Sequence, residues 1–463
     1  MTPSSEGPTA DVPERDRRDP YHSALLRGLT MPRTRPRQAA GQRPARPAGP
    51  AGGWSMIGRR EFLRLSGLMA GGGVLLAACG EDRPVSPPPP PEPSPLPELT
   101  VTEYWTGKTP AGHLDFANWP LYIDTSAVRA DAHPTLDTFT HATGITVSYH
   151  EVIENDESFY AGIRPLLEAV RPVGYDLMVI TNGQVLAELI RLNHLAPLDA
   201  SRLPAFFANA DESIVNPAYD PNNRFTVAWQ SGITGIAYDP NRTGREIRSF
   251  NDLFDPAFAG RVGMFGDVRD LPNFALVGMG ITPETSTPAH WRKAADILRK
   301  QRDDRIVRNY YQQDYIEPLK KGDIWLSMAW SGDIFQANSE GADLRFIIPD
   351  EGGILWTDSM CIPVTAPHPV DAITFMDFAY QIDIAAKLAE GINYITPVPF
   401  ARDRIIRDAG AASGAAQAQM MATADSPLVF PVRSDLARLR RYRVLTRAEA
   451  AEWNSLFQPI YQS

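Results

Sequence analysis

The chain has few cysteines and histidines, and this scarcity weakens several functional readings. Its 463 residues include two cysteines, Cys79 and Cys361, and eight histidines. Two cysteines cannot build a disulfide framework or a cysteine-based zinc site. The sequence also lacks a G-x-S-x-G elbow, an H-E-x-x-H pair, a P-loop and a G-x-G-x-x-G turn after an expected strand. It therefore predicts no bound metal and no cofactor, and nothing in it supports a hydrolase or a metalloenzyme.

The charge of the chain is acidic and unevenly distributed. Residues 1–78 contain 12 basic and 6 acidic residues, whereas the rest contains 33 basic and 49 acidic residues. An acidic body argues against nucleic acid as a partner, because phosphate binding requires a basic surface. The same acidity is favourable for cationic ligands.

The N-terminal region resembles an export signal rather than a folded domain. Residues 1–55 are rich in Pro, Arg and Gly, so we expect them to be disordered. Alternatively, translation starts at Met56 and these residues do not belong to the protein. In residues 56–78, Arg59 and Arg60 precede a weakly apolar run that is too short to span a bilayer, which resembles a twin-arginine signal. "LLAAC" resembles a bacterial lipobox, in which Cys79 becomes lipidated. The proline-rich residues 79–98 predict a semi-rigid tether.

From Leu99 onward, short apolar runs alternate with amphipathic segments. Strands are expected at 144–152, 175–180, 225–240, 260–265 and 324–330, and helices at segments such as 184–193. Such alternation predicts an α/β architecture with a mostly parallel sheet. Ligands of such sheets bind at the carboxyl ends of the strands. A site is therefore expected in the loops that follow the strands.

Aromatic and acidic side chains recur together in those loops and strand ends. In "EGGILWTDSMCIPV", Trp356 and Asp358 lie two residues apart, so they share one face of a strand. An aromatic face attracts an ammonium group by ~0.5–2 kcal/mol, and a carboxylate accepts a charge-assisted hydrogen bond from it. A flexible polyamine such as putrescine or spermidine would satisfy both groups. Taken singly, each of these residues is more often a core aromatic or a turn acid, and only the set points to a ligand.

Five stretches carry a resemblance to a known family. "NWPLYID", "YDLMVITN", "GDVRD", "MAWSGDIFQA" and "EGGILWTDSMCIP" resemble, in this order, the polyamine-binding proteins of ABC importers. The resemblance implies a type II periplasmic-binding-protein fold, in which two α/β lobes are joined by a hinge and the ligand lies between them. Residues 99–230 with 355–400 would form the first lobe, and residues 231–354 with 401–463 the second.

The resemblance also implies the ligand-binding residues. They are the aromatics Trp119, Tyr122, Trp330, Trp356 and Tyr394, the acids Asp267, Asp270, Asp333 and Asp358, and the hydroxyl of Thr181. Asp333 matches an acid of the putrescine-type branch. Pro120, Gly183 and Asp270 (in place of a more common Glu) depart from the family pattern. These departures leave open the choice between putrescine and spermidine.

The sequence thus predicts a monomeric, extracytoplasmic solute-binding subunit that needs no cofactor and performs no catalysis. Its partners would be a polyamine, the membrane permease of an importer and, through the lipid on Cys79, the membrane itself. Three alternatives remain open: the same fold binding a sugar or another small cation, a lipoprotein recruited to sensing, and an envelope enzyme.

Overall fold

The computed structural model of the chain describes residues 93–462 except 127, 130 and 131. The predicted extension, the export arginines Arg59 and Arg60, the lipidation site Cys79 and most of the tether lie outside the described residues. Within them the strands form one ten-stranded sheet. The strands are β1 (His113–Asn118), β2 (Thr146–Glu151), β3 (Leu177–Thr181), β4 (Thr226–Tyr238), β5 (Val262–Phe265), β6 (Val307–Tyr311), β7 (Leu326–Trp330), β8 (Arg345–Ile347), β9 (Gly353–Cys361) and β10 (Leu439–Arg440).

The sheet is mixed, and the expectation of a mostly parallel sheet is wrong for its centre. The strand order is β2-β1-β3-β9-β4-β7-β5-β6. β1 pairs in parallel with β2 and β3, and β5 pairs in parallel with β6 and β7. β9 runs antiparallel to β3 and β4, and β4 runs antiparallel to β7 and β8. The two parallel groups are therefore joined by antiparallel pairs that involve β4 and β9.

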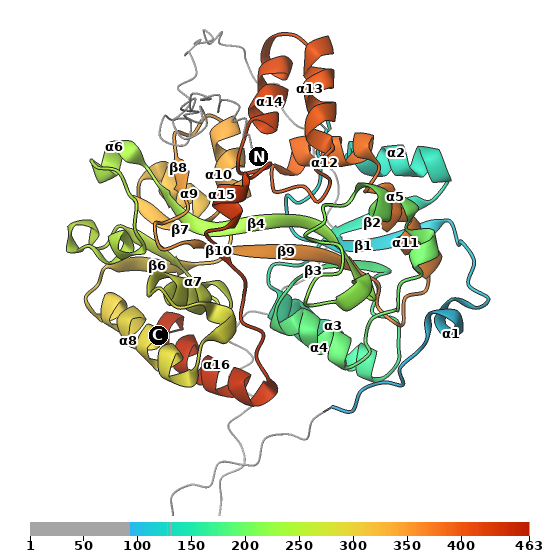
Figure 1. Cartoon of the computed structure of the whole chain (residues 1–463), viewed down its shortest axis with the longest axis horizontal. Helices are drawn as coiled ribbons and strands as arrows, with labels where there is room; N and C mark the ends of the chain where they lie inside the picture. Colours follow the sequence, from blue (N-terminus) through green and yellow to red (C-terminus); the bar gives the residue numbers. More distant parts are fainter. Residues whose placement is uncertain (1–92, 127, 130–131, 463) are drawn as a thin grey trace, which may run out of the picture. The chain divides into compact units, whose positions relative to one another are not determined.

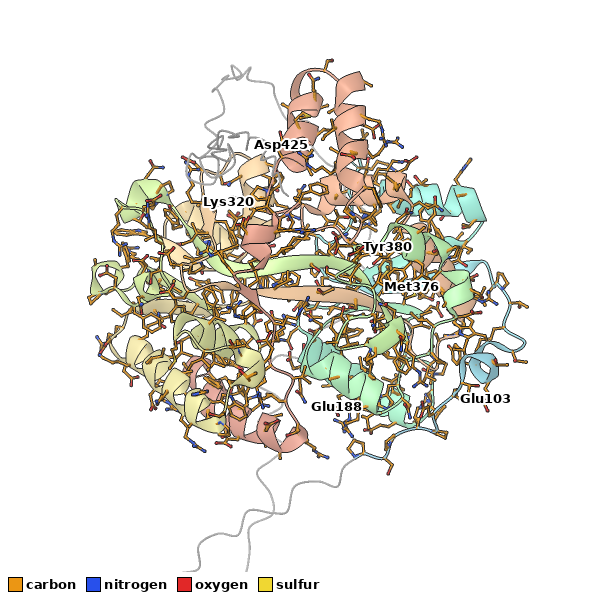
Figure 2. The ribbon with its side chains drawn as sticks, in the orientation of Figure 1. Glu103, Glu188, Lys320, Met376, Tyr380 and Asp425 are labelled. Atoms are coloured by element: carbon orange, nitrogen blue, oxygen red, sulfur yellow. The ribbon has the colours of Figure 1, made fainter. Side chains whose placement is uncertain are left out.

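Helices flank the strands on both sides of the sheet. They are α1 (Val101–Trp105), α2 (Pro134–Thr143), α3 (Asp156–Glu168), α4 (Gln184–Arg191), α5 (Pro204–Asn209), α6 (Pro240–Thr243), α7 (Asp270–Gly278), α8 (Pro288–Asp303), α9 (Ile316–Lys321), α10 (Ser331–Ser339), α11 (Pro369–Phe378), α12 (Ile382–Ile392), α13 (Ala401–Ala411), α14 (Gly414–Ala424), α15 (Arg433–Leu436) and α16 (Arg447–Tyr461). Figure 2 shows Glu188 and Lys320 at the periphery of this body, whereas Met376 and Tyr380 lie in its interior.

Local sequence signals explain several helix boundaries. Asn155 caps α3, because its side-chain oxygen accepts a hydrogen bond from the Ser158 N–H. Pro165 neither splits nor ends that helix. The helical stretch that begins at Pro369 is divided into α11 and α12 by extended backbone at Gln381. Capping and extended backbone thus set where these helices begin and end.

Figure 1 shows β4 and β9 running side by side across the middle of the described body. The lobe boundaries predicted at 230/231 and 354/355 fall within these two strands. At one end, the β4–β9 pair continues into the group of strands β1, β2 and β3. In the core beside that group, the rings of Phe116 and Phe375 pack at 5.2 Å between centroids. At the other end, the pair continues into the group of strands β5, β6, β7 and β8. Paired long strands of this kind suit a hinge, and the exact division into lobes stays a prediction.

The C-terminal segment is divided between the two ends of the sheet. α13 packs on α12, where Arg404 pairs with Asp383. By contrast, α16 packs on α8, and Trp453 contacts Trp291 at 5.3 Å between ring centroids. Helices of residues 401–463 thus pack on different elements, and the assignment of this segment to the second lobe stays a prediction.

Candidate functional site

β9 places Trp356 and Asp358 in the interior, as their spacing predicts. The Trp356 indole N–H donates to Thr234 Oγ1 at 3.1 Å. Gly232 lies opposite Trp356 in the β4–β9 register, and a methyl group there would overlap the indole ring. Thr181, opposite Asp358 in the β3–β9 register, donates its hydroxyl to Asp358 Oδ1 at 2.6 Å. The neighbouring strands thus fix both side chains.

Four aromatic rings from distant segments form a continuous series. Trp330 at the end of β7 meets Trp356 at 6.4 Å between centroids, nearly edge to face. Trp356 then meets Tyr394 at 5.5 Å, and Tyr394 meets Tyr122 at 5.3 Å. Gly332 faces the Tyr394 ring so closely that a methyl group there would overlap it. This series, Trp330–Trp356–Tyr394–Tyr122, is called the aromatic wall below.

Asp333 and Asp358 lie beside the aromatic wall and have neutral hydrogen-bond partners. Asp333, in the first turn of α10, accepts hydrogen bonds from the hydroxyls of Tyr315 at 2.8 Å and Tyr394 at 2.5 Å. Burial raises the pKa of Asp333 and of Asp358 to about 6, and the hydroxyl donors offset part of that rise. Both carboxyls therefore change charge close to neutral pH.

A second group of charges surrounds Arg269. Its guanidinium pairs closely with Asp156 at the start of α3 and lies 3.5 Å from Asp270 Oδ2 through Nε. Tyr442 stacks under the same guanidinium and donates its hydroxyl to Asp270 Oδ1 at 2.8 Å. Burial raises the pKa of Asp156 to about 7, although Arg269 opposes that shift. The protein thus supplies its own cation to Asp156 and Asp270.

Residues 174–416, more than half of the chain, match the family described as bacterial extracellular solute-binding protein. The chain belongs to this family. The spermidine/putrescine-binding periplasmic protein of Salmonella typhimurium is 30% identical over 289 residues, which are 61% of this chain and 77% of the relative. Spermidine/putrescine-binding periplasmic protein 1 of Haemophilus influenzae is 31% identical over 262 residues, which are 56% of this chain and 71% of the relative. The resemblance read from the sequence motifs is confirmed.

Solved structures support the fold of this solute-binding protein. The spermidine/putrescine ABC transporter substrate-binding protein of Streptococcus pneumoniae superposes with a TM-score of 0.62 at 21% identity, covering 76% of this chain and 98% of that one. A lipoprotein of Treponema pallidum gives a TM-score of 0.62 at 18% identity, covering 76% of this chain and all of that one. The predicted periplasmic-binding-protein fold is therefore confirmed. Among the described residues, no helix combines the length and apolar character needed to cross a bilayer.

The solute-binding protein brings together most of the residues predicted for its site. Those that gather at the aromatic wall or bond to its carboxylates are Tyr122, Thr181, Trp330, Asp333, Trp356, Asp358 and Tyr394. Asp270 instead joins Arg269, as described above. Trp119 is tied to β3, because its indole N–H donates to the Val179 carbonyl at 3.0 Å. Asp267 is half-buried and caps α7 by accepting from the backbone N–H groups of Arg269 and Asp270. The ligand-binding role of every one of these residues stays a prediction.

Sequence reasoning missed Asp156, Tyr315 and Tyr442. Asp156 sits at a helix start, where an acid is ordinarily read as favourable to the helix dipole. Tyr315 lies before a short helix in a segment that showed no motif. Tyr442 comes from the C-terminal segment, in which no contact was assigned. For Arg269, one signal was present: it is the basic residue of the acidic loop "GDVRD".

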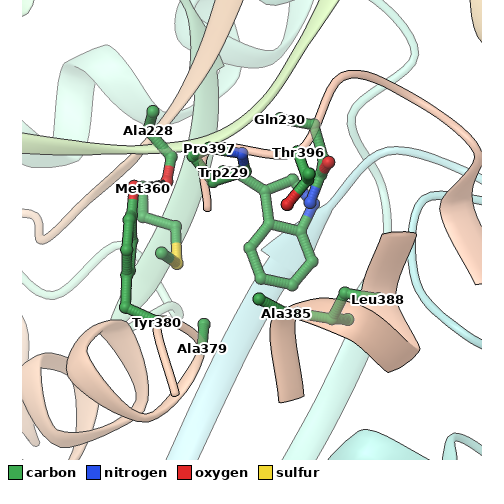
Figure 3. Close-up of a pocket in the computed structure, with 10 residues that line it drawn as sticks. All are labelled: Ala228, Trp229, Gln230, Met360, Ala379, Tyr380, Ala385, Leu388, Thr396 and Pro397. Carbon is green, nitrogen blue, oxygen red and sulfur yellow. Dashed lines mark hydrogen bonds between the residues drawn. The ribbon is translucent and has the colours of Figure 1, made fainter. Parts of the chain in front are cut away.

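A separate small pocket lies beside β4 and β9, next to α12 (Figure 3). Its cavity volume is about 10 Å³, room for about one water molecule, and its lining includes Trp229, Met360 and Tyr380. None of the predicted binding residues lines it. The aromatic wall, in contrast, consists of rings packed on one another, and three of its four rings are buried.

Arg269→Gln is expected to lower the unfolding free energy of the protein by about 3–5 kcal/mol, because it leaves the buried Asp156 carboxylate unpaired. Urea unfolding followed by circular dichroism measures the loss. The double variant Asp156→Asn, Arg269→Gln removes both charges and is expected to recover part of it. Equal losses in the single and double variants would show that the ion pair is not the cause.

Proposed function

We propose that this solute-binding protein captures a polyamine outside the cytoplasm and presents it to the permease of an ABC importer. The observation that carries the proposal is a pair of carboxylates, the partly buried Asp333 and the buried Asp358, whose hydrogen-bond donors are neutral hydroxyls. Taking a carboxylate out of water costs free energy unless a cation compensates it. A ligand ammonium group supplies that cation. The names of the relatives, which are polyamine-binding periplasmic proteins, support the same ligand class.

The aromatic wall suits the rest of such a ligand. Ring faces attract an ammonium group and pack against the methylenes between two ammonium groups. The buried hydroxyl of Tyr122 faces the Asp358 carboxyl and helps to lower its pKa, so Tyr122 holds that acceptor beside the aromatic wall. In this proposal Trp330, Trp356 and Tyr394 stack on the ligand, and Asp333 and Asp358 each accept one ammonium group.

Entry of the ligand requires the site to open. Tyr122, Trp356, Asp358 and Tyr394 are all buried, each with no more than 6% of its surface exposed. We propose that β4 and β9 act as the hinge, because both strands continue from one parallel group to the other. A hinge motion about them would separate Trp330 and Asp333 from Asp358 and Tyr122.

We propose a diamine rather than a triamine, because two carboxylates at the aromatic wall lack a basic partner. Asp156 and Asp270 are already paired with Arg269, whereas Asp333 and Asp358 have no basic partner within hydrogen-bond or ion-pair distance among the described residues. Two uncompensated carboxylates match two ammonium groups. Putrescine therefore fits this arrangement better than spermidine.

A thermal-shift and calorimetry screen of the protein against polyamines, amino acids, sugars and betaines tests the proposal. Putrescine is expected to raise the melting temperature most, with spermidine at least tenfold weaker in affinity. Because the recognition is ionic, putrescine affinity should fall as salt is raised, in contrast to sugar affinity. A sugar that binds tightly and independently of salt would favour the alternative ligand, and no shift with any polyamine would overturn the proposal.

The protein is proposed to act without catalysis, since the relatives are solute-binding proteins rather than enzymes. Relatives named as periplasmic support an extracytoplasmic location. Anchoring through Cys79 and the monomeric state remain proposals of the same kind. If the protein serves in sensing rather than transport, it binds the same ligand but has a different protein partner. The screen therefore tests the ligand under both alternatives.

A further inference from the structure

Three of the eight histidines converge on two aspartates beside β1, β2 and β3. His113 and Asp115 lie two residues apart on β1, and His150 lies on the adjacent β2. Asp176 directly precedes β3, and His368 directly precedes α11. No sequence motif reveals this group, because its members come from four separate segments. It is called the histidine–aspartate cluster below.

The nitrogen and oxygen atoms of the cluster lie at short, similar distances. His113 Nε2 and His150 Nε2 are 3.2 Å and 3.1 Å from the two oxygens of Asp115, and His368 Nδ1 is 3.0 Å from Asp176 Oδ2. One donor atom each from Asp115, Asp176 and His368 lie within 4.8 Å of one another. Two ligands that bind Zn²⁺ tetrahedrally at about 2.0–2.1 Å are themselves about 3.3 Å apart. The cluster therefore has the spacing that a metal ion requires, with small adjustments.

The charge of the cluster is uncompensated by basic residues. Asp176 is 1% exposed, and it accepts backbone hydrogen bonds from Asp115 at 2.9 Å and His368 at 2.7 Å. Among the described residues, the ion pairs of Asp115 and Asp176 involve histidines and no Lys or Arg. A carboxylate without such a partner is stabilised by a cation. Imidazole nitrogens are common ligands of such an ion.

We infer that the histidine–aspartate cluster is a binding site for one divalent transition-metal ion, with Zn²⁺ as the best match. Asp115, Asp176 and His368 provide the first three ligands. His113 and His150 contact Asp115 directly, so they either complete the coordination or orient that carboxylate. Mixed imidazole and carboxylate donors suit Zn²⁺, Cu²⁺ and Ni²⁺ better than Ca²⁺ or Mg²⁺, which prefer oxygen ligands alone.

This metal site is separate from the proposed polyamine site. Asp176 directly precedes β3, whereas Thr181, whose hydroxyl donates to Asp358, is the last residue of that strand. Five residues of strand at about 3.3 Å each place the two residues about 17 Å apart. Zn²⁺ is therefore expected to bind without competing with putrescine, and the two assignments can fail independently.

The test uses the full-length protein, stripped with a chelator and dialysed against Zn²⁺ alone. Elemental analysis is expected to find one more Zn²⁺ per chain in the wild type than in Asp115→Asn or His368→Gln, with at least tenfold weaker affinity in both variants. His141→Gln, which changes an exposed histidine of α2 outside the cluster, is the matched control and should retain wild-type binding.

Circular dichroism and a thermal melt without ligand report whether each variant is folded. If Asp115→Asn fails to fold, His150→Gln and His368→Gln carry the test, because both side chains are partly exposed. Wild-type protein that retains no Zn²⁺, or cluster variants that bind as well as His141→Gln, would overturn the inference. In that case the cluster is a hydrogen-bonded network that ties β1, β2 and α11 together.

Discussion

Asp358→Asn is expected to weaken putrescine binding by 30- to 1,000-fold, which corresponds to about 2–4 kcal/mol. The carboxylate lies in the interior, and its partner Thr181 is neutral, so a ligand ammonium group would be its nearest full positive charge in our proposal. Asn keeps the shape and one acceptor oxygen but loses the negative charge. Isothermal titration calorimetry at pH 7.5 and low salt measures the change.

The same substitution is expected to leave the empty protein equally or more stable. Burial raises the pKa of Asp358 to about 6, above the usual value near 4, so its ionised form is disfavoured in the folded state. A raised carboxyl pKa means that folded protein binds more protons than unfolded protein between about pH 4 and 6. Stability from this group therefore falls as pH rises through that range. At pH 7.5 Asn removes that cost, which a thermal melt without ligand detects.

Asp220 provides the matched control for Asp358. It is also a buried aspartate, but its oxygen accepts hydrogen bonds from Phe225 N–H, Thr226 N–H and the Thr226 hydroxyl, in the segment that leads into β4. Asp220→Asn should lower the melting temperature and leave putrescine affinity within about twofold. If both variants lose stability and neither loses affinity, Asp358 is a structural residue and the proposed site is wrong.

The pairing of Trp356 and Asp358 was predictable because it rests on strand alternation, which is a local property. They lie two positions apart, and β9 is regular over that length, so they share a face whatever lies around them. The partners that hold them were not predictable. Thr234 and Thr181 reach them across β4 and β3, and that register is set by long-range pairing.

The same distinction explains the errors in the fold. Alternating strands and helices correctly indicated an α/β protein, and βαβ connections made the β1–β3 and β5–β7 groups parallel. β4 and β9 have ordinary strand sequences, and nothing local shows that they return through the middle of the sheet in the opposite sense. Ion pairs are equally hard to predict from the sequence, as Arg269 shows. Its sequence neighbours are Asp267 and Asp270, yet its closest partner is Asp156, more than a hundred residues earlier.

Putrescine affinity is expected to fall by about two orders of magnitude between pH 7.5 and pH 5. Both ammonium groups of the ligand remain charged in this range, since amines of this kind titrate near pH 10. Asp333 and Asp358, whose pKa values burial raises to about 6, are mostly ionised at pH 7.5 and mostly protonated at pH 5. A bound ammonium group stabilises the ionised form, so each carboxyl must release a proton before or during binding. Each therefore contributes about tenfold at pH 5.

Calorimetry in buffers of different ionisation enthalpy measures both the affinity and the protons released on binding. About one to two protons should be released per putrescine near pH 5, and almost none at pH 7.5. The double variant Asp333→Asn, Asp358→Asn should bind weakly with little dependence on pH, which assigns the effect to these two groups. The empty wild-type protein should show the opposite trend, because protonation removes the cost of two buried charges. An affinity that stays constant from pH 7.5 to pH 5 would mean that neither carboxylate receives an ammonium group.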